Sequence, residues 1–143
     1  MKNKGFFFED ISIGDVLPRS ELKVTRTHIV KFAGAGGDFN PIHHDEEYAK
    51  ALGLPSVFAM GLMSAGYLSA ILTNWAGVEN VKQYKVRYSG LVWPGDLLTF
   101  EGRVEGLDND LGEVSCSLHA LNQNGEKVIQ AEAKAHLPAR NAN

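Results

Sequence analysis

An acidic side chain and an imidazole frame the short segment Asp38-Phe39-Asn40-Pro41-Ile42-His43. A straight strand would place Asp38 and His43 on opposite faces, because side chains alternate along a strand. A helix cannot continue through the segment, since Pro41 has no N–H and pushes Asn40 out of the helical region. The pattern therefore predicts a tight turn in which the Asn40 side chain bonds to nearby backbone. Such a turn can bring an acid and a base onto one small molecule, where they can move a proton of bound water.

Short helices are predicted on both sides of this turn. The first spans His28–Ala35, with Thr25 or Thr27 as its N-cap. Gly36-Gly37 ends that helix, because glycine readily adopts the left-handed conformation found there. The second helix spans about Asp45–Leu52, where acidic residues in the first turn complement the helix dipole. The side chains that these helices are expected to bury are Ile29, Phe32, Ala33, Tyr48, Ala49 and Leu52.

The segment Gly61–Trp75 is predicted to be a longer, buried helix. Apolar residues occur on nearly every side of it, which is typical of a helix enclosed by other elements. It would be roughly 22 Å long at a rise of about 1.5 Å per residue. The wider apolar stretch from Val57 to Leu72 is interrupted by glycine and serine and falls short of the ~20 apolar residues that a bilayer span needs. We therefore expect no membrane association.

The C-terminal half is predicted to consist of strands, because apolar and polar residues alternate along it. Trp93-Pro94-Gly95-Asp96 fits a type II turn, and Asn124-Gly125 fits a hairpin turn. Near the N-terminus, Phe6–Ile13 and Leu17–Val24 are also expected to be strands. The expected C-terminal strands are Lys82–Tyr88, Leu97–Gly106, Glu113–Leu121 and Lys127–Leu137.

Strands with one polar face and one apolar face need an apolar layer over the second face. Gly61–Trp75 is the only predicted element that is long and apolar enough to provide this layer. The predicted fold class is therefore α+β, with an antiparallel sheet wrapped around one long central helix. A length of 143 residues favours a single domain over residues 1–143, with a core over about residues 6–138.

Composition excludes several classes of protein. A net charge of −3 and a pI of 5.9 argue against a nucleic-acid-binding surface. The single cysteine, Cys116, cannot form an internal disulfide, and no signal peptide is evident. We therefore expect a cytoplasmic protein. No metal site is expected either, because the adjacent side chains of His43, His44 and Asp45 diverge.

The whole pattern resembles the MaoC-like hydratases. The motif Gly37-Asp38-x-Asn-Pro-Ile-His43 carries most of the resemblance, together with the glycine-led apolar helix and the segments Tyr84–Tyr88 and Trp93–Asp96. These proteins are single hot-dog domains that act as (R)-specific enoyl-thioester hydratases or 3-hydroxyacyl-thioester dehydratases. The resemblance implies a hot-dog fold, hydro-lyase activity in fatty-acid metabolism on thioesters of coenzyme A or acyl carrier protein, no cofactor, and at least a homodimer.

The resemblance also implies roles for individual residues. Asp38 and His43 match the catalytic pair, and Asn40 matches the residue that holds the motif in shape. Gly61 matches the glycine at the start of the helix, whose backbone N–H faces the thioester carbonyl oxygen. Ser69 falls where many members have a serine that supports the catalytic loop.

The acyl pocket is expected near the subunit interface, lined by Phe39, Pro41, Met60 and Leu62. Met60 stands where the family usually has a histidine. Because that position is not part of the catalytic pair, we expect activity to be retained. The hydrogen bond that the usual histidine makes would be missing.

Hydration of a 2-enoyl thioester needs a base for water, an acid for C2, and a donor for the negative charge that develops on the thioester oxygen. Asp38, His43 and the Gly61 amide form such a set, with Asp38 the stronger candidate for the base. The local pattern alone leaves other interpretations open: Asp38 can cap the following turn, and His43 can be a structural imidazole. Two other functions compete, an acyl thioesterase and a non-catalytic partner subunit. The lack of Asp or Glu from Gly61 to Val78 disfavours the thioesterase.

Overall fold

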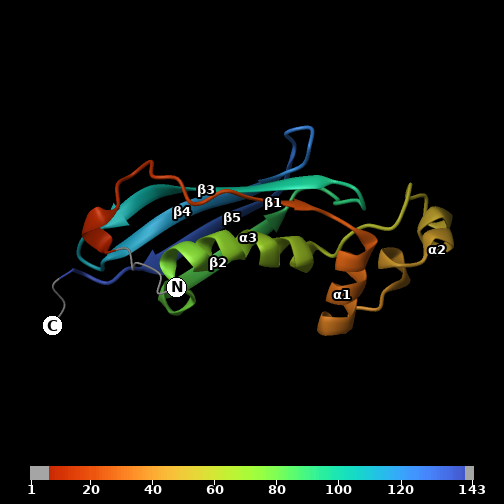
Figure 1. Cartoon of the computed structure of the whole chain (residues 1–143), viewed down its shortest axis with the longest axis horizontal. Coiled ribbons are helices and arrows are strands. Elements are labelled where there is room, and N and C mark those ends of the chain that lie inside the picture. The colour runs from red at the N-terminus through yellow and green to blue at the C-terminus, as the bar shows by residue number, and fades with distance from the viewer. Residues whose placement is uncertain (1–6, 141–143) are drawn as a thin grey trace.

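The computed structural model describes residues 7–140. Five strands form one sheet in the order β1-β3-β4-β5-β2, and every neighbouring pair runs antiparallel. The long helix α3 (Gly61–Ala76) lies along one face of this sheet (Figure 1). The predicted α+β architecture, a sheet around one central helix, is confirmed. The strands are β1 (Ser20–Lys23), β2 (Val81–Tyr88), β3 (Leu97–Asp108), β4 (Glu113–Leu121) and β5 (Lys127–His136).

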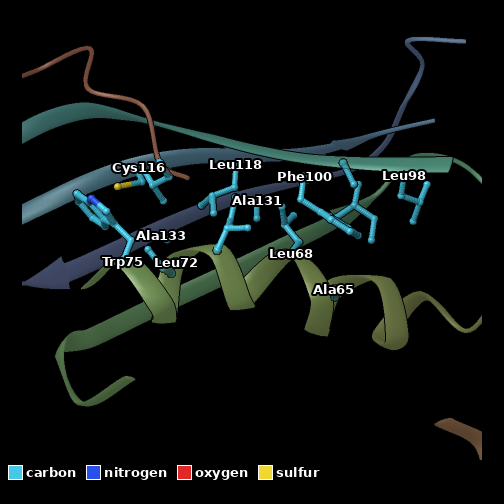
Figure 2. Packing of buried hydrophobic residues seen from close by; sticks show 14 of the residues in the cluster. Ala65, Leu68, Leu72, Trp75, Leu98, Phe100, Cys116, Leu118, Ala131 and Ala133 are labelled. Atoms are coloured by element: carbon cyan, nitrogen blue, oxygen red, sulfur yellow. The ribbon is translucent and has the colours of Figure 1, made fainter. Parts of the chain in front are cut away.

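The core lies between α3 and the sheet. Leu68 and Leu72 of α3 are completely buried against inward-facing side chains of the central strands, such as Phe100 and Leu118 (Figure 2). The burial pattern of β4 alternates residue by residue, as expected for a strand with one apolar face. Within residues 7–140, no helix combines the length and the apolar character needed to cross a bilayer.

The two predicted turns of the C-terminal half are present. Asp96 N–H donates to the Trp93 carbonyl oxygen at 3.1 Å, and Gly95 has φ of +98°, as the third position of a type II turn requires. At the β4–β5 hairpin, Gly125 has φ of +77° and its N–H donates to the Asn122 carbonyl oxygen. These turns explain why the strand boundaries fall within one or two residues of those predicted.

Strand β2 is attached to the N-terminal half of α3 by a hydrogen bond as well as by packing. The Tyr84 hydroxyl donates to the Ala65 carbonyl oxygen at 2.8 Å, and burial raises the pKa of this phenol. The bond links the edge strand of the sheet to the helix on which the candidate site depends.

Removal of this hydroxyl in Tyr84→Phe is expected to lower the free energy of unfolding by about 1 kcal/mol, the net value of a typical hydrogen bond. Urea denaturation followed by far-UV circular dichroism measures the change. Tyr67→Phe is the matched control, since the Tyr67 hydroxyl has no hydrogen bond among the residues described; it should change stability by less than about 0.5 kcal/mol. Equal effects of the two variants would contradict the prediction.

The helices α1 (Arg26–Gly36) and α2 (Glu46–Ala51) lie beyond the N-terminal end of α3, and the Asp38–His43 segment runs between them (Figure 1). Thr25 is the N-cap of α1, as one of the two predicted candidates, and its side chain accepts a hydrogen bond from the His28 N–H. Gly37 ends α1 in the left-handed conformation, with φ of +70°. The capping residues therefore agree with the prediction, although the helix begins two residues before the predicted His28 and ends one residue after the predicted Ala35.

The burial predicted for the second helix is wrong at two positions. Ala49 is fully buried, but Tyr48 is 44% exposed and Leu52 is 56% exposed. The helix is one residue shorter at each end than predicted, and Ala49 is its one buried residue.

The predicted strand over Phe6–Ile13 is also wrong. Phe6 lies outside the described residues, and Phe8–Asp10 forms a 3₁₀ turn, η1, whose Phe8 N–H donates to the Pro138 carbonyl oxygen. Of the predicted strand Leu17–Val24, only Ser20–Lys23 pairs continuously with β3, because Pro18 cannot donate to a strand ladder.

Candidate active site

The Asp38–His43 segment folds into a tight turn that brings its acid and its imidazole together. Asp38 Oδ2 lies 3.7 Å from His43 Nε2. The His43 side chain is only 10% exposed, whereas that of Asp38 is 46% exposed. The imidazole is therefore fixed inside the protein while the carboxylate can be reached from outside.

Asn40 shapes this turn from within. Its Oδ1 accepts a hydrogen bond from the Ile42 N–H at 3.2 Å, so that it caps the 3₁₀ turn η2 (Pro41–His43). The Asn40 N–H donates to Asp38 Oδ1 at 3.4 Å. With Oδ1 engaged by the backbone, Oδ2 is the Asp38 oxygen that faces His43.

The tautomer of His43 follows from its second contact. His43 Nδ1 lies 2.7 Å from the Phe58 carbonyl oxygen, and the Phe58 ring packs edge-on against the imidazole. A carbonyl oxygen can only accept, so Nδ1 carries the proton. In the neutral ring, Nε2 then has a free lone pair, and it faces the Asp38 carboxylate. Two acceptors that face one another in this way can both bind a single water molecule.

An ion pair joins the elements around the turn. Arg26 of α1 donates to Glu46 Oε2 of α2 at 2.8 Å, and the Ser56 hydroxyl donates to the same oxygen at 3.2 Å. The hydrogen bond from Arg26 lowers the pKa of Glu46, and the Ser56 bond acts in the same direction. This cluster holds α1 and α2 around the turn that lies between them. No local pattern predicted it, because its members come from distant parts of the sequence.

Gly61 begins α3 and leaves a backbone donor free. Met60 is the N-cap, and its side chain makes no capping hydrogen bond. In the described part of the chain the Gly61 N–H has no acceptor, as is usual for the first turn of a helix. A Cβ at this position would lie 2.7 Å from Cε1 of Tyr88. Glycine is therefore required here by the close approach of the Tyr88 ring.

A cavity of about 330 Å³ opens beside the first turn of α3. Phe58 connects it to the acid–imidazole pair, because its carbonyl oxygen binds His43 while the residue also lines the cavity. Neither Asp38 nor His43 lines the cavity itself. The lining residues are Phe58, Ala59, Gly61, Leu62, Ser64, Tyr88, Gly90, Leu91, Val92 and Ile129.

Residues 11–122 match the family model of the MaoC like domain. The chain belongs to the MaoC-like dehydratase family. An (R)-specific enoyl-CoA hydratase from Rhodospirillum rubrum is 31% identical over 137 residues, which cover 94% of this chain and 93% of that protein. The crystal structure of the ChsH1–ChsH2 complex from Mycobacterium tuberculosis has a TM-score of 0.79 at 28% identity, over 88% of this chain and 98% of that one.

The hot-dog fold expected for a MaoC-like protein is confirmed by a further solved structure. The unliganded (R)-hydratase PhaJ1 from Pseudomonas aeruginosa has a TM-score of 0.85 over 95% of this chain and 88% of that one. At a sequence identity of 23%, this similarity establishes the shared fold alone.

The residues expected to line the MaoC-like acyl pocket lie in different places. Leu62 lines the cavity, but Met60 is 3% exposed and belongs to the core beneath α3. Phe39 is 66% exposed and Pro41 is also at the surface, because both lie on the outer side of the turn whose inner side holds His43. Leu62 is therefore the one member of the expected set at this cavity.

Within the described chain, Ser69 makes no side-chain hydrogen bond to the Asp38–His43 turn. Its hydroxyl donates to the Gly66 carbonyl oxygen of α3 at 2.8 Å. The prediction also missed Phe58, Ser64 and Tyr88, which form much of the site. Only Ser64 had a local signal, since a residue three positions after Gly61 lies on the same side of a helix. Phe58 and Tyr88 approach the site through tertiary packing.

Proposed function

We propose that this chain catalyses the (R)-specific hydration of trans-2-enoyl thioesters, or the reverse dehydration of (R)-3-hydroxyacyl thioesters. The observation that carries the proposal is the pair of facing acceptors, Asp38 Oδ2 and His43 Nε2, at 3.7 Å. It is supported by the neighbouring cavity, by the free Gly61 amide, and by the similarity to an (R)-specific enoyl-CoA hydratase over almost the full length of both chains.

In the hydration direction, one water molecule is held between the two acceptors, with a hydrogen directed to each of them. Its oxygen attacks C3 of the enoyl group, and one O–H bond breaks as the proton passes to Asp38, the proposed base. The electron pair of the C2=C3 bond moves toward the thioester oxygen, which gains negative charge. The enolate is then protonated at C2 from the same acid–imidazole pair, so that one water is added overall.

The Gly61 N–H binds the thioester oxygen during this step. Backbone N–H groups at a helix N-terminus have a fixed direction, and the positive end of the helix dipole lies there. Both features favour binding of a negatively charged oxygen. A donor of this kind stabilises the enolate more than the neutral thioester, and so lowers the barrier. The mostly apolar wall of the cavity suits the acyl chain.

The test is an assay with 2-enoyl thioesters of short and long chain length, on both coenzyme A and acyl carrier protein. Loss of the enoyl-thioester absorbance should be accompanied by formation of the (R)-3-hydroxyacyl thioester, identified by chiral chromatography. Release of free thiol with the double bond intact would replace the proposal with a thioesterase. Turnover that appears only after a second, different chain is added would replace it with a partner-subunit role.

We also propose that the active form is at least a homodimer. Strand β2 is at the edge of the sheet, with one side open to backbone pairing, and unpaired edges favour association. Leu62 and Tyr88, which line the cavity, are 69% and 50% exposed, so a second copy at this edge would cover them. Light scattering coupled to size-exclusion chromatography should give twice the chain mass or more. A monomer with full activity would contradict this proposal.

A cytoplasmic location is proposed as well. It is supported by the single cysteine of the sequence, which has no disulfide partner within the chain. Cys116 is a buried core residue, and burial raises the pKa of its thiol to about 11. Because the thiolate is the reactive form, this thiol has little reactivity.

A further inference from the structure

Ser64 is a buried polar side chain without a partner. It is 1% exposed, and in the described part of the chain its Oγ is a buried side-chain polar atom that makes no hydrogen bond. Buried hydroxyls in folded proteins are almost always bonded, because leaving one unpaired is destabilising. Because Ser64 also lines the cavity beside the first turn of α3, a ligand in that cavity is the candidate to supply the missing partner.

Other hydroxyls on the same helix behave differently. Ser69 donates to the Gly66 carbonyl oxygen at 2.8 Å, and Thr73 donates to the Ala70 carbonyl oxygen at 3.4 Å. These bonds to the preceding turn are the common solution for serine and threonine within a helix. Ser64 does not make such a bond, although it lies on α3 as they do, so its hydroxyl is left without a partner in the described chain.

The position of Ser64 relates it to the free amide. Ser64 follows Gly61 by three residues, so the two lie on the same side of α3, and both line the cavity. Helical side chains lean toward the N-terminus, which brings the Ser64 hydroxyl toward the first turn, where the Gly61 N–H is free. Apart from Ser64 and Tyr88, the side chains that line the cavity are apolar.

We propose that the Ser64 hydroxyl is a second hydrogen-bond donor to the thioester carbonyl oxygen, beside the Gly61 N–H. The inference rests on the proposed function, since it names the acyl thioester as the ligand. Serine hydroxyls serve as donors for developing oxyanions when they are held near a backbone N–H. Ser64 is then a catalytic residue whose lack of an internal partner is explained by its bond to the substrate.

The first experiment compares the steady-state kinetics of Ser64→Ala, Ser64→Thr and the wild type with an enoyl-CoA substrate. Ser64→Ala should lower kcat by about 10- to 100-fold and leave KM within about twofold, because the lost bond strengthens in the transition state. Ser64→Thr keeps the hydroxyl and should retain most of the activity. Thr73→Ala removes a helix hydroxyl remote from the cavity and should behave as the wild type.

Thermal unfolding separates this role from a structural one. Removing an unpaired buried hydroxyl relieves an unfavourable burial, so the Tm of Ser64→Ala should equal or exceed that of the wild type. Lower activity in a protein that is at least as stable cannot come from damage to the fold. Wild-type kcat in Ser64→Ala would overturn the inference, as would a loss of activity that follows a fall in Tm.

A second readout needs no turnover. Butyryl-CoA labelled with ¹³C at the carbonyl carries no double bond to hydrate, and hydrogen bonds lower its C=O stretching frequency in an infrared difference spectrum. The frequency of the bound ester should rise in Ser64→Ala relative to the wild type and be unchanged in Thr73→Ala. An identical frequency in Ser64→Ala and wild type would overturn the inference. Failure of the wild type to hydrate any enoyl thioester would instead defeat the proposed function.

Discussion

Asp38→Asn is expected to lower kcat for enoyl-thioester hydration by about 10³-fold, within the 10²- to 10⁴-fold range usual for a general base. Asparagine has nearly the same shape as aspartate, and its side-chain oxygen can still accept the Asn40 N–H, which now bonds Asp38 Oδ1 at 3.4 Å. The amide cannot take a proton from water, so the turn is retained while the base is lost. Steady-state and single-turnover assays with the same enoyl-CoA measure the loss.

Asp45→Asn is the matched control, because it removes a carboxylate from the same part of the chain. Asp45 is the N-cap of α2, where its Oδ1 accepts the Tyr48 N–H at 3.0 Å, and asparagine is an equally good N-cap. This variant should keep kcat within about twofold of the wild type. Activity of Asp38→Asn close to the wild-type value would remove the acid–imidazole pair from the mechanism.

The cooperation of the two side chains can be tested in one further variant. Asp38→Asn and His43→Ala remove two groups that hold the same water, so their effects should be far from additive. The double variant should be about as slow as the slower single variant. Independent, multiplying losses would mean that Asp38 and His43 act on different steps.

Much of the sheet was predictable because its signals are local. Alternation along Glu113–Leu121 gave the bounds of β4, and Pro94-Gly95 and Asn124-Gly125 fixed the turns between strands. The turn at Asp38–His43 was predictable for the same reason. Pro41 excludes a helix through the segment, and an Asn side chain next to it stabilises a bend.

The burial of side chains around α2 was harder to predict, since it depends on which other elements pack against this helix. Tyr48 and Leu52 are apolar at helical spacing, yet the described chain leaves about half of each residue exposed. The lead-in segment shows a related limit. Phe8 is apolar and belongs to an apolar segment, but its N–H donates to the Pro138 carbonyl oxygen near the other end of the chain rather than to a strand.

Some residues of the candidate site could likewise be predicted from local sequence patterns, and others could not. The acid, the imidazole and the helix-start glycine belong to two short segments that sequence alone could identify. The contact of Phe58 with His43 and that of the Tyr88 ring with Gly61 are tertiary contacts, and neither carries a local signal. Ser69 was expected to support the turn, but its hydroxyl is already bonded to Gly66.

The second large effect is expected for Gly61→Ala, which should lower kcat/KM for hydration by about 10²-fold. The added Cβ would lie 2.7 Å from Cε1 and 2.9 Å from Cδ1 of Tyr88, closer than carbon atoms can approach. The clash is relieved by a shift of the start of α3, which turns the Gly61 N–H away from the position of the thioester oxygen, or by movement of the half-exposed Tyr88 ring, which changes the wall of the cavity. Loss of one such donor typically reduces catalysis 10²- to 10³-fold.

Gly34→Ala is the matched control for this substitution. Gly34 lies within α1, and a Cβ there would meet nothing within 4 Å. Alanine in place of a helical glycine should raise the free energy of unfolding by up to about 1 kcal/mol and leave hydration unchanged. Gly61→Ala combines this gain in helix propensity with the clash, so its stability should remain within about 1 kcal/mol of the wild type.

Removal of the Tyr88 ring tests whether its clash with the added Cβ causes the loss of activity in Gly61→Ala. In a Tyr88→Ala background the clash is absent, so adding Gly61→Ala should lower kcat/KM by less than about threefold, and the double-mutant cycle should show strong coupling between the two positions. The same loss in both backgrounds would mean that the Tyr88 contact is not what makes glycine necessary. Full activity of Gly61→Ala in the presence of Tyr88 would mean that the geometry of this amide does not limit hydration, and the oxyanion would then need another donor.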